Sequence, residues 1–111
     1  MQIAPSTGAV KAKLFRGLSD QSRLTILETL RDKPLTVTEI VERTGLTQPN
    51  VSNHLGCLKS CGLVVSAQSG RYVTYSLSSQ TVENLLLIAD GLLNECATRI
   101  DTCDHYAQQK G

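Results

Sequence analysis

Apolar residues recur at helical spacing in the first third of this chain, and turn-forming residues separate the segments. In the segment 9–18, one stripe consists of Val10, Leu14 and Leu18. The next stripe consists of Leu24, Ile26, Leu27 and Leu30. We expect Ser19 or Asp20 to cap this second helix and the Lys-Pro pair at 33–34 to end it, because a residue before proline is pushed out of the helical region. The preceding residues 1–8 contain several breakers and are predicted to form a disordered arm.

Two further helices are predicted, with a short glycine turn between them. The residues expected to begin and end them are Thr36 or Thr38, Gly45, Thr47 and Gly62. The later helix spans Gln48–Ser60 and carries Pro49 in its first turn, where proline costs no helical hydrogen bond. A helix, a glycine turn and a second helix together are typical of the helix-turn-helix DNA-binding motif.

The pattern then changes from helical spacing to alternation. Leu63–Ala67 and Tyr72–Leu77 are rich in residues that favour strands, and Tyr72–Leu77 alternates β-branched and aromatic side chains. The turn Gln68–Arg71 lies between them. These segments predict a two-stranded hairpin directly after the helix-turn-helix.

A long apolar helix follows the hairpin, capped by Ser78 or Ser79 and reaching about Asp101. A terminal helix this apolar on a small domain usually packs against a partner. The elements together predict a mainly α fold with a small β-hairpin wing, that is, a winged helix-turn-helix. We expect this domain to span residues 9–101 and a C-terminal tail to span residues 102–111.

Charge is unevenly distributed along a chain whose net charge is only +1. Residues 1–80 carry nine basic and five acidic side chains, whereas residues 81–111 carry two and five. No acid occurs between Thr44 and Val82, which leaves a region suited to binding phosphate. The near-neutral total excludes a protein that coats polyanions through bulk charge, but it allows a local basic surface.

No segment of the sequence is apolar enough to span a membrane, since the longest apolar run is Leu85–Ala89. The N-terminus also lacks the hydrophobic region of a signal peptide. We therefore expect a cytoplasmic protein without a membrane partner. In that reducing compartment its four cysteines are expected to be free thiols or metal ligands rather than disulfides.

A polar, acid-free face of the helix 48–60 is the first candidate site. Val51, Leu55 and Leu58 share the stripe expected to be buried, so most of the polar side chains lie opposite it. Amides pair with adenine edges, hydroxyls reach bases or phosphates, and basic side chains neutralise phosphate. The candidate DNA-binding residues are Thr47, Gln48, Asn50, Ser52, Asn53, His54, Lys59 and, in the hairpin, Arg71. The alternative is a solvated helix surface without a partner.

The cysteines form the second candidate site. Cys57 and Cys61 are four residues apart on one helix, so their thiolates can share a soft metal ion; the alternative is a pair of small core residues. Cys96 continues the apolar stripe of the last helix and is expected to pack there. Cys103 lies in a polar, acidic tail beside His105, where a ligand role is favoured. Three sulfur ligands suit Cd(II) or Pb(II), and As(III) chemically as well.

Four stretches of the sequence carry a family resemblance in the order in which they occur. They are LSDQSRLTIL at 18–27, LTQPNVSNHL at 46–55, LV at 63–64 and GRYVTY at 70–75. These motifs resemble the ArsR/SmtB family of winged-helix metalloregulators, and the resemblance covers about residues 10–100. It implies a homodimer with the first and last helices at the interface. It also implies a repressor that binds double-stranded operator DNA and is released by metal.

Members of that family sense metals through different sites, and this sequence is most similar to the kind that senses cadmium and lead. The resemblance implies a site made of Cys57 and Cys61 with Cys103 from the partner protomer. Cys96 is the less favoured third ligand, and an arsenic-type site with Cys96 and Cys103 stays open. The resemblance therefore implies Cd(II) or Pb(II) as inducer, Zn(II) or As(III) as alternatives, and no organic cofactor. The controlled genes would be those of metal efflux or resistance.

Two rival functions keep the same fold: a thiol-redox regulator, and a winged-helix module that binds proteins instead of DNA. Cysteines four residues apart in one helix are poorly placed for an unstrained disulfide, which counts against the first rival. An enzyme is not expected. The sequence shows no catalytic Ser-His-Asp or Cys-His spacing, no glycine-rich phosphate loop and no paired carboxylates in an obvious pocket.

Overall fold

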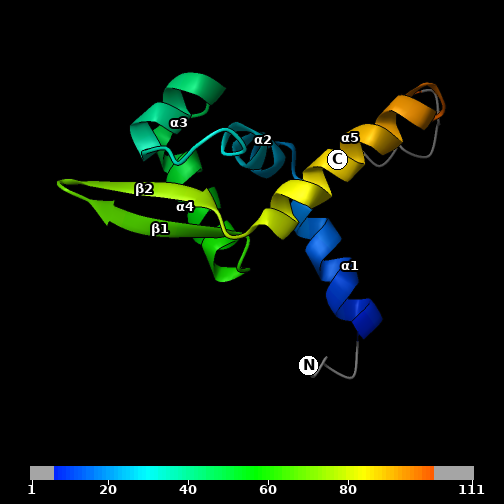
Figure 1. The fold of residues 1–111 in the computed structure, drawn as a ribbon, viewed down its shortest axis with the longest axis horizontal. Coiled ribbons are helices and arrows are strands. Elements are labelled where there is room, and N and C mark those ends of the chain that lie inside the picture. Colours follow the sequence, from blue (N-terminus) through cyan, green and yellow to red (C-terminus); the bar gives the residue numbers. More distant parts are fainter. Residues whose placement is uncertain (1–6, 102–111) are drawn as a thin grey trace. The chain divides into compact units, whose positions relative to one another are not determined.

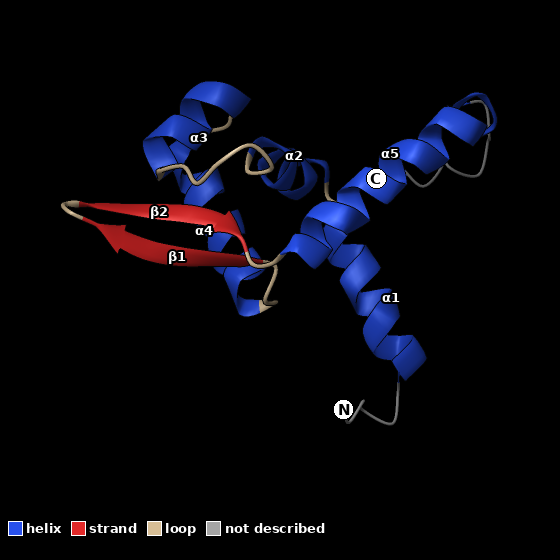
Figure 2. Cartoon of the chain, viewed as in Figure 1, coloured by secondary structure: helices blue, strands red, loops and turns tan. Residues whose placement is uncertain are grey.

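The structure is a computed structural model that describes residues 7–101, with the side chains of residues 8–96. The elements, in chain order, are α1 (Thr7–Leu18), α2 (Gln21–Thr29), α3 (Val37–Thr44), α4 (Gln48–Ser60), β1 (Val64–Ser69), β2 (Tyr72–Leu77) and α5 (Gln80–Asp101). Figure 1 follows them along the chain, and Figure 2 separates helices from strands. The chain divides into one unit that ends at Ser79 and a second that begins at Gln80. The predicted mainly α fold with a β-hairpin wing is confirmed.

Polar side chains determine where three of the helices begin. Asp20 caps α2, with its carboxylate accepting from the Arg23 backbone N–H at 3.0 Å. Thr36 caps α3 and forms a capping box with Glu39. Thr47 caps α4. The structure thus selects Asp20 over Ser19 and Thr36 over Thr38.

Two helix boundaries differ from those predicted. The first helix begins at Thr7, two residues before the expected start, and residues 1–6 of the predicted arm lie outside the described residues. The second helix ends at Thr29, four residues before the Lys-Pro pair that was expected to end it. The segment after the helix leads instead to a backbone pairing with β2. Leu35 is fully buried and pairs with Tyr75 of β2 through two backbone hydrogen bonds of 3.0 and 2.7 Å. This long-range pairing competes with continuation of the helix.

The core of the first unit is aliphatic and surrounds α4. Its buried residues come from α2 to β1 and are Ile26, Leu27, Leu30, Leu35, Ile40, Val51, Leu55, Leu58 and Val64. The fourth helix contacts α2, α3 and β1, so it is held from three directions. Full burial of an aliphatic side chain contributes about 1.5–3 kcal/mol, and this core therefore determines how α4 is presented.

The hairpin that follows is tighter than its sequence suggested. The strands β1 and β2 are antiparallel, and Ser69 pairs with Tyr72, which leaves a two-residue loop of Gly70 and Arg71. Gly70, the first loop residue, has a φ of 63°. Arg71, the second, has no positive φ, since no described non-glycine residue has one. A positive φ at the first loop residue alone is typical of a type II′ turn. The first strand therefore continues to Ser69, two residues beyond the predicted end. Arg71 lies at the tip of the hairpin.

The last helix, α5, is interrupted where the sequence predicted continuity. Cys96 has non-helical angles, with φ −137° and ψ 20°. Its thiol donates to the Leu92 carbonyl at 3.2 Å, a local side-chain bond of the kind that competes with the helical ladder and bends helices. Several large apolar side chains of this helix are exposed, among them Leu87, Ile88 and Leu92. None of the helices in the described part of the chain has the length and apolar character that a membrane crossing requires.

Candidate nucleic-acid interface and thiol site

The fourth helix has one buried stripe and a continuous exposed polar surface. Val51, Leu55 and Leu58 are at most 1% exposed, as the helical spacing predicted. The exposed polar candidates of the recognition helix are Gln48, Asn50, Ser52, Asn53 and Lys59. No acidic side chain belongs to this helix. The surface therefore offers amide, hydroxyl and ammonium groups, the donors and acceptors that read base edges and bind phosphate.

Two of these candidates already have a partner within the chain. The Thr47 hydroxyl accepts from the Asn50 backbone N–H at 3.3 Å, which caps the start of α4. Thr47 also borders the polar surface. The Lys59 ammonium donates to the Ser66 hydroxyl of β1 at 2.8 Å. This bond connects the last turn of α4 to the base of the wing. The side chain of Lys59 is thereby held at the junction of the two elements expected to face DNA.

His54 lies differently from the other candidates. It is half-buried, whereas Asn53 and Ser52 are exposed. Donation by the Arg23 backbone N–H holds the pKa of the Asp20 carboxyl below its usual value, and the positive charges of Arg23 and His54 act in the same direction. The contact of His54 with DNA stays a prediction.

Arg71, the candidate from the wing, is exposed and borders a groove of about 540 Å³ between the hairpin and the start of α3. The acid that lines this groove is Glu39, whose carboxylate accepts from the Thr36 backbone N–H at 2.9 Å. This donation holds the pKa of Glu39 below its usual value.

The thiol pair lies at the other end of α4. Cys57 and Cys61 are both free and exposed, so the alternative of two small core residues is wrong. Cys61 lies just beyond the last helical residue, Ser60, but keeps helical backbone angles, and its N–H donates to the Cys57 carbonyl at 3.0 Å. The two side chains are therefore one helical turn apart on the same face, as the sequence predicted.

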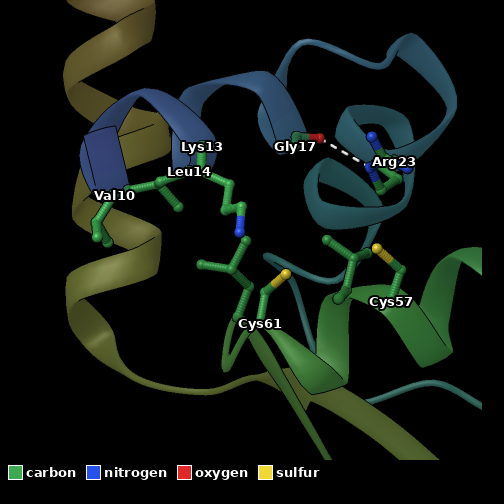
Figure 3. Close-up of a pocket in the computed structure, with 9 residues that line it drawn as sticks. Val10, Lys13, Leu14, Gly17, Arg23, Cys57 and Cys61 are labelled. Carbon is green, nitrogen blue, oxygen red and sulfur yellow. Dashed lines mark hydrogen bonds between the residues drawn. The ribbon is translucent and has the colours of Figure 1, made fainter. Parts of the chain in front are cut away.

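Both cysteines line a cavity of about 200 Å³ beside α1 (Figure 3). Val10 and Leu14 of α1 contribute apolar walls, together with two leucines of the α4–β1 region. Two cationic side chains also line it, Lys13 and Arg23, and the Arg23 Nε–H donates to the Gly17 carbonyl at 2.8 Å. In Figure 3 the Lys13 side chain extends toward Cys61, and Arg23 lies on the side of Cys57. The thiols thus face an apolar cavity with a basic rim.

The sequence did not indicate the α1 side of this cavity. Lys13 and Leu14 are separated from Cys57 by more than forty positions, and no local pattern reports which helices meet across such a distance. Cys96 is half-buried in α5, and Cys103 lies outside the described residues. Within residues 7–101, no three His, Cys, Asp or Glu side chains gather as a metal-binding group.

Comparison with known proteins places this geometry in context. A family model described as "Bacterial regulatory protein, arsR family" matches residues 20–66. A probable mercury resistance operon repressor of Streptomyces lividans is 37% identical over 92 residues, which cover 83% of this chain and 74% of that protein. The transcriptional regulator CmtR of Mycobacterium tuberculosis is 40% identical over 91 residues, which cover 82% of this chain and 74% of that protein.

Solved structures agree with these sequence matches. The NMR structure of CmtR, described as a cadmium metal-sensor, has a TM-score of 0.61 and 43% identity, and covers 68% of this chain and 78% of that chain. A homodimeric winged helix-turn-helix DNA-binding domain from Mycobacterium bovis has a TM-score of 0.76 and 25% identity. That match covers 88% of this chain and 93% of the other. The domain from Mycobacterium bovis is described as a winged helix-turn-helix, which is also the architecture of this chain.

Proposed function

Because this chain belongs to the ArsR family of bacterial regulatory proteins, we propose that it is a homodimeric repressor released from operator DNA by a thiophilic metal ion. The family consists of DNA-binding transcriptional regulators and not of enzymes. The observation that carries the proposal is the position of Cys57 and Cys61, which are exposed on the same helix that presents the polar surface. Recognition of DNA and binding of metal then involve opposite ends of one element.

The DNA-binding part of the proposal rests on α4 and the wing. In helix-turn-helix dimers, two recognition helices enter successive major grooves about 34 Å apart. Gln48, Asn50, Ser52 and Asn53 are exposed and available to base edges, while Lys59 and Arg71 neutralise phosphates on either side.

Association into a dimer is supported by a relative and by exposed apolar surface. The domain from Mycobacterium bovis is described as homodimeric. In this chain, Val10 and Phe15 of α1 are about half exposed, and Ile88 and Leu92 of α5 are 68% and 56% exposed. Large apolar side chains of this kind are costly to leave in water and favour association. We propose that α1 and α5 supply the dimer interface.

The metal part of the proposal rests on the donor chemistry. Soft thiolates select ions such as Cd(II) and Pb(II), and the two exposed thiols of Cys57 and Cys61 fit such an ion. We assign the third sulfur to Cys103 of the partner subunit, with Cys96 as the alternative. When bound, such an ion would connect the thiolates of α4 to a sulfur of the C-terminal segment. Relatives described as a cadmium sensor and as a mercury resistance repressor support a soft inducer; Zn(II) and As(III) remain alternatives.

Metal binding and DNA binding are coupled directly in this proposal, because both involve side chains of α4. Cys57 is four positions from Asn53, so a constraint on the last turn of α4 acts on the helix that reads DNA. Allosteric coupling free energies are typically about 1–3 kcal/mol, and by linkage DNA must weaken metal binding by the same factor. Because thiols lose protons when they ligate metal, the response is expected to weaken in acid.

The test is a titration of operator DNA with and without Cd(II), using duplexes selected by the purified protein from a random library. The Cys57→Ser and Cys61→Ser proteins are expected to bind the duplex as well as the wild type does but to ignore Cd(II). Ser60→Ala is the matched control, since Ser60 is exposed between the two cysteines and carries no thiol. Operator affinity that is the same with and without Cd(II) in the wild type ends the proposal.

A further inference from the structure

A side-chain hydrogen bond joins α4 to the wing within the first unit. The exposed ammonium of Lys59, in the last turn of α4, donates to the half-buried hydroxyl of Ser66 in β1 at 2.8 Å. Figure 1 shows β1 beside α4, and the two elements are in contact. Neither α4 nor the hairpin contains a carboxylate. Ser66 therefore holds the ammonium without neutralising its charge, as a carboxylate partner would.

Ser66 is itself held by backbone pairing. It lies opposite Tyr75 in the hairpin, and Tyr75 exchanges two backbone hydrogen bonds of 3.0 and 2.7 Å with Leu35. Leu35 is fully buried in the core of the unit. The hydroxyl that orients Lys59 thus belongs to the part of the hairpin that is tied to the core. A lysine side chain loses rotamer freedom when it binds a ligand, and a partner that orients it in advance reduces that cost.

We propose that Lys59 and Ser66 form one binding site for a phosphate of the DNA backbone, in which Ser66 orients Lys59 and donates to the same phosphate. An ammonium has three donor hydrogens, so two remain after the bond to Ser66. Ser66 accepts that bond through an oxygen lone pair and keeps its own O–H to donate. The pair therefore offers several donors and one positive charge to phosphate oxygens. The inference deepens the proposed function and rests on its DNA-binding part, but not on its metal part.

The location of the pair fits a contact with the DNA backbone. In helix-turn-helix proteins the recognition helix lies in the major groove. The sugar-phosphate backbone forms the edge of that groove, so a side chain at the junction of the helix with a neighbouring element faces the backbone. Lys59 is seven positions, or about two helical turns, from Ser52 and lies on the same side of α4. A phosphate bound at Lys59 and Ser66 therefore borders the bases within reach of the polar surface of α4.

Phosphate contacts carry no sequence information, which gives this site a distinct signature. Ser66→Ala is expected to weaken binding to the selected operator and to an unrelated duplex of equal length by the same factor, about threefold to tenfold. Lys59→Met is expected to weaken both by at least about tenfold. It should also lower the slope of log affinity against log salt by about 0.9 for each protomer bound. Ser66→Thr keeps the hydroxyl and should restore wild-type binding.

A double-mutant cycle tests whether the two side chains serve one phosphate. In the Lys59→Met background, Ser66→Ala is expected to change affinity by less than about twofold, because its orienting effect is lost together with the ammonium. Fluorescence anisotropy with the full chain between about 50 and 200 mM salt measures affinity and slope. Fully additive effects, or Ser66→Ala with wild-type affinity for both duplexes, overturn the inference.

The matched control is Ser76→Ala. Ser76 is half-buried in β2 next to Tyr75, so its side chain lies on the opposite face of the hairpin from Ser66. This variant should keep the wild-type affinity and salt slope, and a loss equal to that of Ser66→Ala overturns the inference. If Ser66→Ala does not fold, Ser66→Val against Ser66→Thr makes the same comparison. These two side chains have nearly the same shape, both favour strands, and only threonine has a hydroxyl.

Cd(II) titration of the same variants keeps this inference distinguishable from the proposed function. A normal cycle between Lys59 and Ser66 in a protein whose DNA binding ignores Cd(II) supports this inference and counts against release by metal. Operator binding that is unaffected by Ser66→Ala but is released by Cd(II) overturns this inference alone. Wild-type protein that binds neither duplex overturns both.

Discussion

The two ends of α4 differ in what surrounds them, although one buried stripe holds both. The first half, from Thr47 to Asn53, is capped by a hydroxyl and presents amides and hydroxyls to solvent. The last turn, from Cys57 to Cys61, lies against the apolar cavity beside α1. A single helix therefore carries both the proposed DNA-reading surface and the proposed thiol site. The difference teaches that, if both proposals hold, a ligand at one end of α4 needs no other element to act on the DNA-reading end.

The two ends are also fastened differently to the rest of the unit. The turn before α4 contains Gly45, with a φ of 78°, which ends α3 in the left-handed conformation that favours glycine. The turn after α4 contains Gly62, with a φ of 81°, and the Leu63 N–H donates to the Leu58 carbonyl at 2.9 Å. The bond from Lys59 to Ser66 then joins this end to the wing. Movement of the thiol end is thus expected to move the base of the hairpin as well.

The largest expected effect comes from a substitution in the buried stripe of α4, which supports both ends of the helix. Leu55 is 1% exposed at the middle of the buried stripe. Leu55→Ala is expected to cost about 2–5 kcal/mol of unfolding free energy, because the lost burial adds to the cavity left behind. DNA binding and thiol-site binding should fail together. Urea unfolding measures the loss, and Ser52→Ala, at an exposed position of the same helix, serves as control. Loss of only one function would show that the ends are independently supported.

A second substitution separates the ends. Asn53→Ala removes an exposed amide from the reading surface and is expected to weaken operator binding by about 1–3 kcal/mol, or roughly tenfold to hundredfold. Its unfolding free energy should stay within about 0.5 kcal/mol of the wild type, as for most surface substitutions. Cd(II) affinity without DNA should not change. Fluorescence anisotropy with labelled duplex measures the first quantity, and a weakened Cd(II) affinity would contradict the separation.

Gly56, between the two ends, allows opposite effects on stability and binding. It is exposed in the middle of the helix, and a methyl group there would meet no atom within 4 Å. Gly56→Ala is expected to stabilise the fold by up to about 1 kcal/mol through helix propensity. If DNA approaches the backbone closely at this position, operator affinity falls at the same time. Thermal unfolding and anisotropy are the two measurements. A stabilised protein with undiminished affinity would place DNA away from Gly56.

The smallest expected effect concerns the pH dependence of stability at Asp20, the residue that caps α2. The folded pKa of Asp20 lies below its unfolded value, chiefly because its carboxylate accepts from the Arg23 N–H. Its contribution to stability is therefore present above the unfolded pKa and is lost as the pH falls through the folded pKa. Asp20→Asn keeps a capping oxygen but does not titrate. Urea midpoints from pH 7 to pH 3 should fall less steeply in this variant; parallel curves would contradict the assignment.

Local chemistry explains why much of the fold was predictable. The buried stripe of α4, the threonine cap of that helix and the glycine stop of α3 all depend on residues within a few positions of each other. The family resemblance also rested on local motifs. It is confirmed by the family model and by relatives that are 37% and 40% identical over more than four fifths of the chain. Helical spacing likewise placed the two cysteines on one face.

Features that depend on distant contacts were not predictable in the same way. The end of α2 was placed too late because Leu35 pairs with Tyr75, forty positions away. The interruption at Cys96 is a local exception: its thiol donates to the Leu92 carbonyl four positions earlier, a bond that hydrophobic spacing does not indicate. The domain limits, the metal ligands and the DNA contacts remain predictions for the experiments above.

By itself, the sequence determined the order and type of the elements, the polar surface of α4 and the spacing of Cys57 and Cys61. Hydrophobic periodicity and capping act over a few residues, so they can be recognised without knowing what lies across the molecule. Only the tertiary structure decided that the thiols are exposed, that Lys13 and Leu14 meet them around a cavity, and that Lys59 is held by Ser66. Those features arise from packing between segments far apart in the chain, where side-chain volume and competition for hydrogen bonds select the partners.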